Sequence, residues 1–98
     1  MSKRTKACAI TQKVKKIVWE RDRQRCIFCH TPYANPEAHV ISRAKGGLGV
    51  EENIVTVCRE CHRKMDQTSE RVWRIEFAKA YLKDHYKDWN EERLVYKK

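Results

Sequence analysis

The sequence lacks any long apolar run, and this absence limits the kind of protein that it can encode. No segment approaches the roughly 20 consecutive apolar residues that a membrane-spanning helix needs. The apolar stretch Ala7–Ile10, which follows a basic start, is also too short for the core of a secretory signal peptide. We therefore expect no membrane association and a cytoplasmic protein whose cysteines stay reduced.

Acidic side chains are scarce relative to basic ones. The chain of 98 residues has 13 Asp and Glu against 22 Lys and Arg, which gives a formal net charge of +9. Such an excess indicates a polyanionic partner, most simply nucleic acid, although it could serve solubility alone. With no internal repeat or low-complexity segment, residues 1–98 read as one small domain. Residues 1–10 are polar and basic, and we expect them to form a mobile tail.

Glycine and proline are rare, and each is confined to one place. Both prolines lie in 31–36 and all three glycines lie in 46–49, so these segments are predicted to be loops. Between the loops, 37–41 is short and apolar, and beyond the second loop 54–57 is rich in β-branched residues. We expect these two segments to be strands of one hairpin with a wide connection.

Helical periodicity flanks this hairpin on both sides. The segment 12–22 places its apolar residues on one face, and a second helical pattern runs from residue 60 to about residue 68. Residues 69–98 read as a helical extension. Within it, Trp73 and Phe77 form an i, i+4 ridge that we expect to pack in the core against the first helix.

Four of the five cysteines fall in two C-x-x-C pairs, Cys26 with Cys29 and Cys58 with Cys61. Two such pairs can supply the four sulfur ligands of a closed structural Zn²⁺ site. Two disulfides are the alternative, but paired C-x-x-C motifs in a reducing compartment favour zinc. The spacing between the pairs is long for a zinc ribbon, so we expect a folded segment between them. Cys8 stands apart and is assigned no role.

The segment between the cysteine pairs carries a second group of reactive side chains. His39 lies in the first predicted strand, and an imidazole of ordinary pKa can act as a general base near neutral pH. The amide of Asn53 can bond loop backbone and hold the hairpin connection closed. His62 and Asp66 are four residues apart on a predicted helix and share one face. An imidazole and a carboxylate side by side can hold Mg²⁺, Mn²⁺ or a similar cation.

These groups together suit the hydrolysis of a phosphodiester. His39 would activate water, and a cation on His62 and Asp66 would neutralise charge on the scissile phosphate. A lone histidine is more often structural, so the hypothesis depends on the set rather than on His39 alone. Three basic side chains would hold the flanking phosphates: Arg43, Lys45 and Arg63.

The chain resembles the HNH endonuclease family of the ββα-metal class. The residues that carry the resemblance are Cys26–Cys29, Ala38–Gly47, Glu52–Ile54 and Cys58–Asp66. It implies an α+β fold, a small zinc-stapled ββα-metal (His-Me finger) core over 26–68 with a flanking N-terminal helix and C-terminal helices.

The resemblance also implies an activity, the hydrolysis of duplex DNA by an endonuclease. It makes His39 the general base, Asn53 the residue that orients it, and His62 a ligand of a divalent cation distinct from the zinc. Small members of this kind imply a phage or prophage setting, in a bacterial or phage-infected cell, with phage DNA-packaging proteins as candidate partners. The oligomeric state stays open.

One position departs from the family pattern. Many members carry a metal-ligating His or Asp just before the general base, where this chain has Ala38. Our hypothesis is that Asp66 supplies the acidic ligand instead. The alternative is a zinc-stapled nucleic-acid-binding module that is catalytically weak or inactive. A redox protein is disfavoured, because a closed four-cysteine site leaves only Cys8 free.

Overall fold

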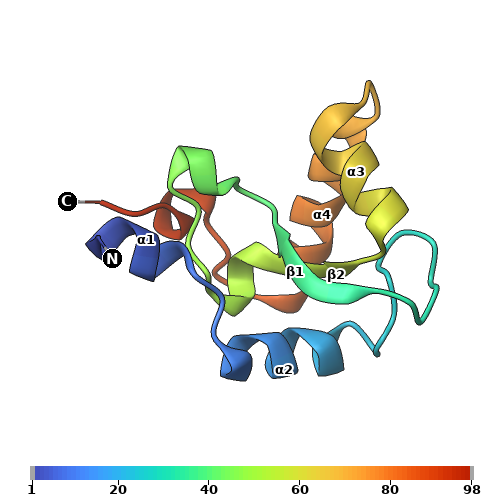
Figure 1. Ribbon diagram of the computed structural model, residues 1–98, viewed down its shortest axis with the longest axis horizontal. Coiled ribbons are helices and arrows are strands. Elements are labelled where there is room, and N and C mark those ends of the chain that lie inside the picture. The colour runs from blue at the N-terminus through green and yellow to red at the C-terminus, as the bar shows by residue number, and fades with distance from the viewer. Residues whose placement is uncertain (1, 98) are drawn as a thin grey trace.

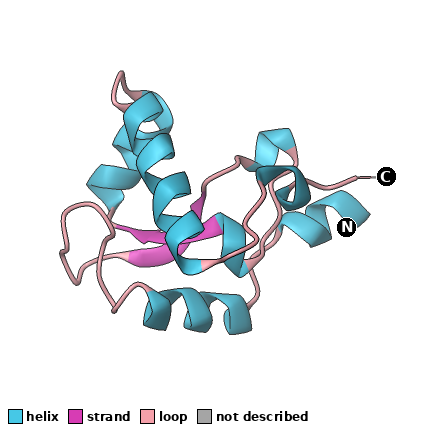
Figure 2. Cartoon of the chain, turned by 180° about the vertical axis from the view of Figure 1, so that it is seen from behind, coloured by secondary structure: helices cyan, strands magenta, loops and turns pink. Residues whose placement is uncertain are grey.

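A computed structural model describes residues 2–97 of the chain (Figure 1). Its elements in chain order are α1 (Lys3–Cys8), α2 (Gln12–Arg21), β1 (Asn35–His39), η1 (Arg43–Lys45), η2 (Glu51–Asn53), β2 (Ile54–Val57), α3 (Arg59–Gln67), α4 (Arg71–His85) and η3 (Glu91–Leu94), where η marks a 3-10 helix. The small antiparallel sheet lies between α2 on one side and the pair α3 and α4 on the other (Figure 2). The predicted α+β class is confirmed. No helix within residues 2–97 has the length and apolar character needed to span a bilayer.

The two strands differ in how deeply they are buried. All four residues of β2 are buried, because helices cover both faces of the sheet there. In β1, Ala38 points into the core, whereas Glu37 and His39 project from the opposite, more exposed face. β1 ends at His39 rather than at the predicted residue 41. The backbone of Ile41 instead bonds the side chain of Asn53, so it is not available to pair with β2.

The helices that hold the reactive residues start at sequence-encoded caps. Thr11 accepts a hydrogen bond from the N–H of Val14 at 3.2 Å and so begins α2, which ends at Arg21, one residue before the predicted end. The sulfur of Cys58 accepts from the N–H of Cys61 and begins α3. α4 starts at Arg71 without a side-chain cap.

Part of the segment 1–10, which the sequence predicts to be a mobile tail, has regular secondary structure. Residues 3–8 form α1, and the buried Cys8 ends it. The carbonyl of Ala7 accepts from the N–H of Gly49 at 3.0 Å, and Arg4 donates to the η1 segment. Lys3 and Lys6 are exposed on α1, whereas Ala7 and Cys8 at its C-terminal end are partly or fully buried.

The two ends of the chain enclose the connection between β1 and β2. From the C-terminal end, the N–H of Leu48 donates to the carbonyl of Leu94 at 2.8 Å, and the N–H of Tyr96 donates to that of Gly46 at 2.7 Å. Gly46 adopts φ +83°, a left-handed conformation that glycine accommodates without steric cost. Figure 1 shows both ends beside η1. The connection is therefore clamped by contacts distant in sequence.

The aromatic ridge of α4 does not face the first helix as expected. Trp73 is 50% exposed and Phe77 is 45% exposed. Both pack on Phe28 of the first cysteine pair, with ring centroids 6.1 and 5.2 Å away. The core positions of α4 are taken by Ala78 and Leu82, whose smaller side chains allow close packing.

A buried ionic network joins the end of α2 to both the sheet and α4. The Arg21 guanidinium forms a two-pronged pair with Asp22 at 2.8 and 3.1 Å and donates to the carbonyls of Glu51 and Ile54, both at 2.7 Å. Asp22 in turn accepts from the Tyr81 hydroxyl at 2.6 Å. Burial would lower the pKa of Arg21, but its bonds to Asp22 hold that pKa above the ordinary value. The network fixes η2 and the start of β2.

Candidate functional site

The four paired cysteines gather into one cluster. The sulfur atoms of Cys26, Cys29, Cys58 and Cys61 all lie within 4.8 Å of one another. Cys29 and Cys58 sulfurs are 3.6 Å apart, far beyond the roughly 2.05 Å of a disulfide. A tetrahedral Zn²⁺ with bonds of about 2.3 Å holds its thiolates about 3.8 Å apart. The geometry supports the predicted metal site and removes the disulfide alternative.

A buried cation beside this cluster fits a metal held by thiolates. Arg74 is only 6% exposed and donates to Glu70 at 3.0 and 3.2 Å. Its Nη1 is buried without a hydrogen-bond partner, and the guanidinium lies against Cys61. Burial raises the pKa of Cys61, and a cluster of neutral thiols offers no strong acceptor to Nη1 of this guanidinium. Thiolates bound to a divalent cation carry a net negative charge that the guanidinium offsets.

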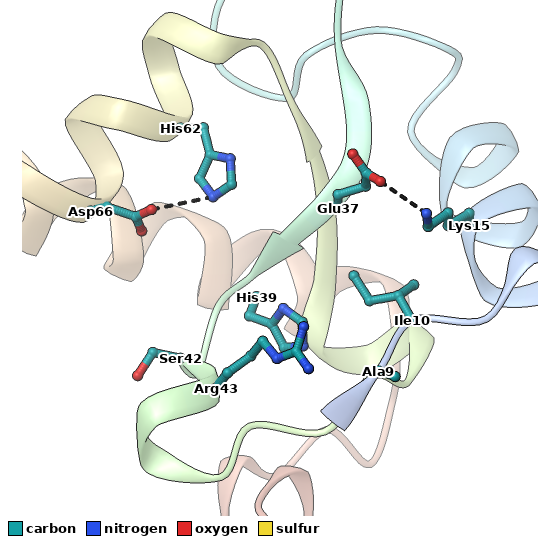
Figure 3. A pocket seen from close by; sticks show the side chains of 9 residues that line it. All are labelled: Ala9, Ile10, Lys15, Glu37, His39, Ser42, Arg43, His62 and Asp66. Carbon is teal, nitrogen blue, oxygen red and sulfur yellow. Dashed lines mark ion pairs between the residues drawn. The ribbon is translucent and has the colours of Figure 1, made fainter. Parts of the chain in front are cut away.

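The second group of reactive side chains lines a pocket of about 500 Å³ between β1 and α3 (Figure 3). Its lining comes from five parts of the chain: Ala9, Ile10, Lys15, Glu37, His39, Ser42, Arg43, His62 and Asp66. The pocket therefore brings together His39, His62, Asp66 and Arg43 from the predicted site.

His39 is half-buried at the base of this pocket. Its Nε2 lies 2.9 Å from the carbonyl oxygen of Cys8. Burial lowers the pKa of His39, and the charges of Arg43 and His62 lower it further, while the Cys8 carbonyl raises it. The net pKa is below the ordinary 6.5, so the imidazole is neutral at pH 7 and able to accept a proton.

Asn53 is fully buried and acts on backbone, not on the His39 ring. Its Oδ1 accepts from the N–H of Ile41 at 2.8 Å. Its Nδ2 donates to the carbonyls of Ile41 at 3.1 Å and Leu48 at 2.9 Å. The amide thereby closes the connection that follows His39, as the sequence suggested it could.

His62 and Asp66 lie one turn apart on α3 and face the pocket. Nε2 of His62 is 3.3 Å from a carboxylate oxygen of Asp66, and the side chains are 41% and 54% exposed. A solvent-accessible imidazole and carboxylate suit a divalent cation that keeps several waters. Ala38 is buried and supplies no ligand. Within residues 2–97, the four cysteines are the one group of three or more potential ligands already gathered to metal-binding distance.

The basic residues predicted to hold phosphates are spread over the surface. Arg43 lines the pocket, and Arg63 lines an adjoining hollow while pairing with Glu60 at 2.7 Å. Lys45 is exposed at the end of η1, outside the pocket that contains His39.

Sequence reasoning missed an ion pair in the pocket wall, between Lys15 of α2 and Glu37 of β1 at 2.9 Å. Strand alternation could have placed Glu37 on the face of His39. No local sequence signal marks Lys15 or the Cys8 carbonyl. Their contacts with Glu37 and His39 depend on how distant parts of the chain pack together.

Comparison with known proteins gives one match. The family model described as HNH endonuclease matches residues 26–77, just over half of the chain. The matched segment contains both cysteine pairs and His39, Asn53, His62 and Asp66. Searches of curated proteins and of solved structures give no significant match.

Proposed function

The chain belongs to the HNH endonuclease family, and from this premise we propose that it is a metal-dependent DNA endonuclease acting at the pocket between β1 and α3. The observation that carries the proposal is the placement of His39 in one pocket with His62 and Asp66. A neutral base and a pair of cation ligands are the parts that phosphodiester hydrolysis requires.

In this proposal His39 takes the proton from the water that attacks phosphorus. Its lowered pKa keeps the imidazole ready to accept that proton at neutral pH. Asn53 holds the connection after His39 closed and so keeps the base at the pocket. A divalent cation held by His62 and Asp66 would neutralise charge on the scissile phosphate and the leaving oxygen.

The four-cysteine cluster has a separate, structural role, with Zn²⁺ as the proposed metal. Four thiolates are the ligand set that structural zinc prefers, and such a closed site has no position for substrate. The cluster joins the loop after α2 to the start of α3. Zinc binding would therefore set the position of His62, which directly follows Cys61.

Duplex DNA is the proposed substrate, held mainly through its phosphates. The net charge of +9 and the exposed basic residues around the pocket support backbone contacts. We assign these contacts to Arg43, Lys45 and Arg63. Binding dominated by phosphate contacts weakens steeply with salt, so affinity measured by titration at several salt concentrations should fall linearly on a log–log plot.

A nicking assay on supercoiled plasmid tests the activity. Wild-type protein is incubated with EDTA, Mg²⁺, Mn²⁺ or Ni²⁺ in separate reactions, beside His39→Ala. His85→Ala is the matched control, because it removes an exposed imidazole outside the pocket. Nicking that needs a divalent cation, persists in His85→Ala and vanishes in His39→Ala is the expected result.

The ligand role of Asp66 has its own test. Asp66→Ala should raise the concentration of Mn²⁺ needed for half-maximal nicking, because it leaves His62 as the single protein ligand proposed. Unchanged metal dependence would remove Asp66 from the site. Binding of DNA without cleavage under any metal would instead favour the inactive binding module, with Ala38 as its cause.

A further inference from the structure

The general base proposed above has a partner that comes from the far N-terminal part of the chain. The carbonyl oxygen of Cys8 lies 2.9 Å from Nε2 of His39, 31 residues away. A carbonyl oxygen can only accept, so Nε2 must carry the hydrogen in this contact. In a neutral ring, the lone pair is then on Nδ1.

We propose that the segment Ser2–Ile10 is an integral part of the active site, in which the Cys8 carbonyl is a positioning group that selects the Nε2–H tautomer of His39. This inference rests on the proposed function for the role of His39, whereas the tautomer can be measured independently of any activity. A side-chain substitution cannot remove a backbone carbonyl, so a scan of reactive side chains would not find this group.

Two contacts hold the segment in place. The first is with Gly49, whose N–H donates to the carbonyl of Ala7 at 3.0 Å. The backbones are so close there that a Cβ on residue 49 would lie 2.0 Å from the carbonyl oxygen of Ala9. Only glycine fits at that position without a backbone shift.

The second contact is an arginine clamp. Nη2 of Arg4 donates to the carbonyl oxygens of Arg43 at 3.2 Å and Ala44 at 2.9 Å. Both anchors act on the same connection that Asn53 closes from within. The segment and the connection are therefore held together at two points, Arg4 and Ala7, that precede Cys8 in the chain.

The segment also forms part of the wall around His39. Ala9 and Ile10 line the same pocket as His39. Without the segment, Nε2 would face water, and the ring would be free to exchange tautomers and to rotate. The other charged groups that line this pocket come from outside the segment: Lys15, Glu37, Arg43, His62 and Asp66.

The test uses full-length protein in three variants. Gly49→Ala displaces the segment at the close backbone approach, and Arg4→Ala releases the clamp more gently. Lys6→Ala is the matched control for Arg4→Ala, because Lys6 is an exposed cation on the same helix. Far-ultraviolet circular dichroism and thermal unfolding show whether each variant is folded.

The first readout is the tautomer of His39 by NMR of protein labelled with ¹⁵N-histidine, assigned with His39→Ala. We expect the Nε2–H tautomer in the wild type and in Lys6→Ala. We expect a mixture of tautomers, or a broadened signal, in Gly49→Ala, and a smaller change in Arg4→Ala. An Nδ1–H tautomer in the wild type, or an unchanged pure Nε2–H signal in folded Gly49→Ala, overturns the proposal.

The second readout is plasmid nicking. Gly49→Ala should lower kcat by about tenfold or more, since small displacements of a base have large effects, with KM for DNA changed far less. A defect confined to KM would contradict a positioning role. If the wild type fails to nick with any metal, the endonuclease proposal fails, while the NMR result still decides whether Cys8 positions His39.

Discussion

The buried amide of Asn53 allows a quantitative prediction about the loop that follows His39. Asn53→Ala removes the partners of three backbone groups: the N–H and carbonyl of Ile41 and the carbonyl of Leu48. Leaving a buried polar group unpaired costs about 1–3 kcal/mol, and water entering the vacated space recovers part of that. We expect the free energy of unfolding to fall by about 3 kcal/mol, a large share of the stability of a small domain.

A near-isosteric variant separates hydrogen bonding from packing. In Asn53→Asp, one oxygen still accepts from the N–H of Ile41, but the other replaces a donor that faces two carbonyl oxygens. If hydrogen bonding dominates, Asp should destabilise at least as much as Ala, despite filling the space. Asn90→Ala is the control, because Asn90 is exposed and caps η3 with one bond, worth about 1 kcal/mol.

The assay is equilibrium urea unfolding of the zinc-loaded protein, followed by far-ultraviolet circular dichroism at fixed zinc concentration. Comparison of midpoints at a common slope gives the change in unfolding free energy. A loss below about 1 kcal/mol for Asn53→Ala, or a clearly milder effect of Asn53→Asp than of Asn53→Ala, would refute the reasoning.

Four further predictions concern other parts of the fold. In urea unfolding, Arg21→Ala should lower the free energy of unfolding by about 3–5 kcal/mol, because it leaves the buried carboxylate of Asp22 without its charged partner. Arg23→Ala, at an exposed position, should lower it little. Cys58→Ser leaves three thiolates, so we expect unfolded or aggregated protein; a soluble variant of native thermal stability would disprove the metal site. Arg74→Gln removes the buried cation beside the thiolates, and competition with a chromophoric chelator should show weaker zinc binding, while equal affinity would mean that this charge is not used. When kcat/KM is measured against pH, its fall on the acid side should have an apparent pKa below 6.5, because protonation of His39 removes the base. An apparent pKa above 6.5 would contradict the lowered pKa of His39.

Local patterns were sufficient for much of the fold because they act over a few residues. Helical periodicity placed α2 and α3 within one residue of their observed bounds, and the run of β-branched residues placed β2 at 54–57. The sequence predictions failed where the space available in the core determined which side chains are buried. Trp73 and Phe77 have the spacing of a core ridge, but the core had room for Ala78 and Leu82 while the aromatics packed on Phe28.

The sequence alone determined the two C-x-x-C pairs, and with them the metal cluster, because four thiols at that spacing have few other uses in a reduced protein. It also determined that His62 and Asp66 share a face, since residues four apart on a helix are always neighbours. Only the tertiary structure decided that Cys8 reaches His39, that Lys15 reaches Glu37 and that Arg74 lies beside Cys61. These contacts join segments between 13 and 31 residues apart, and such contacts depend on how whole elements pack rather than on any local pattern.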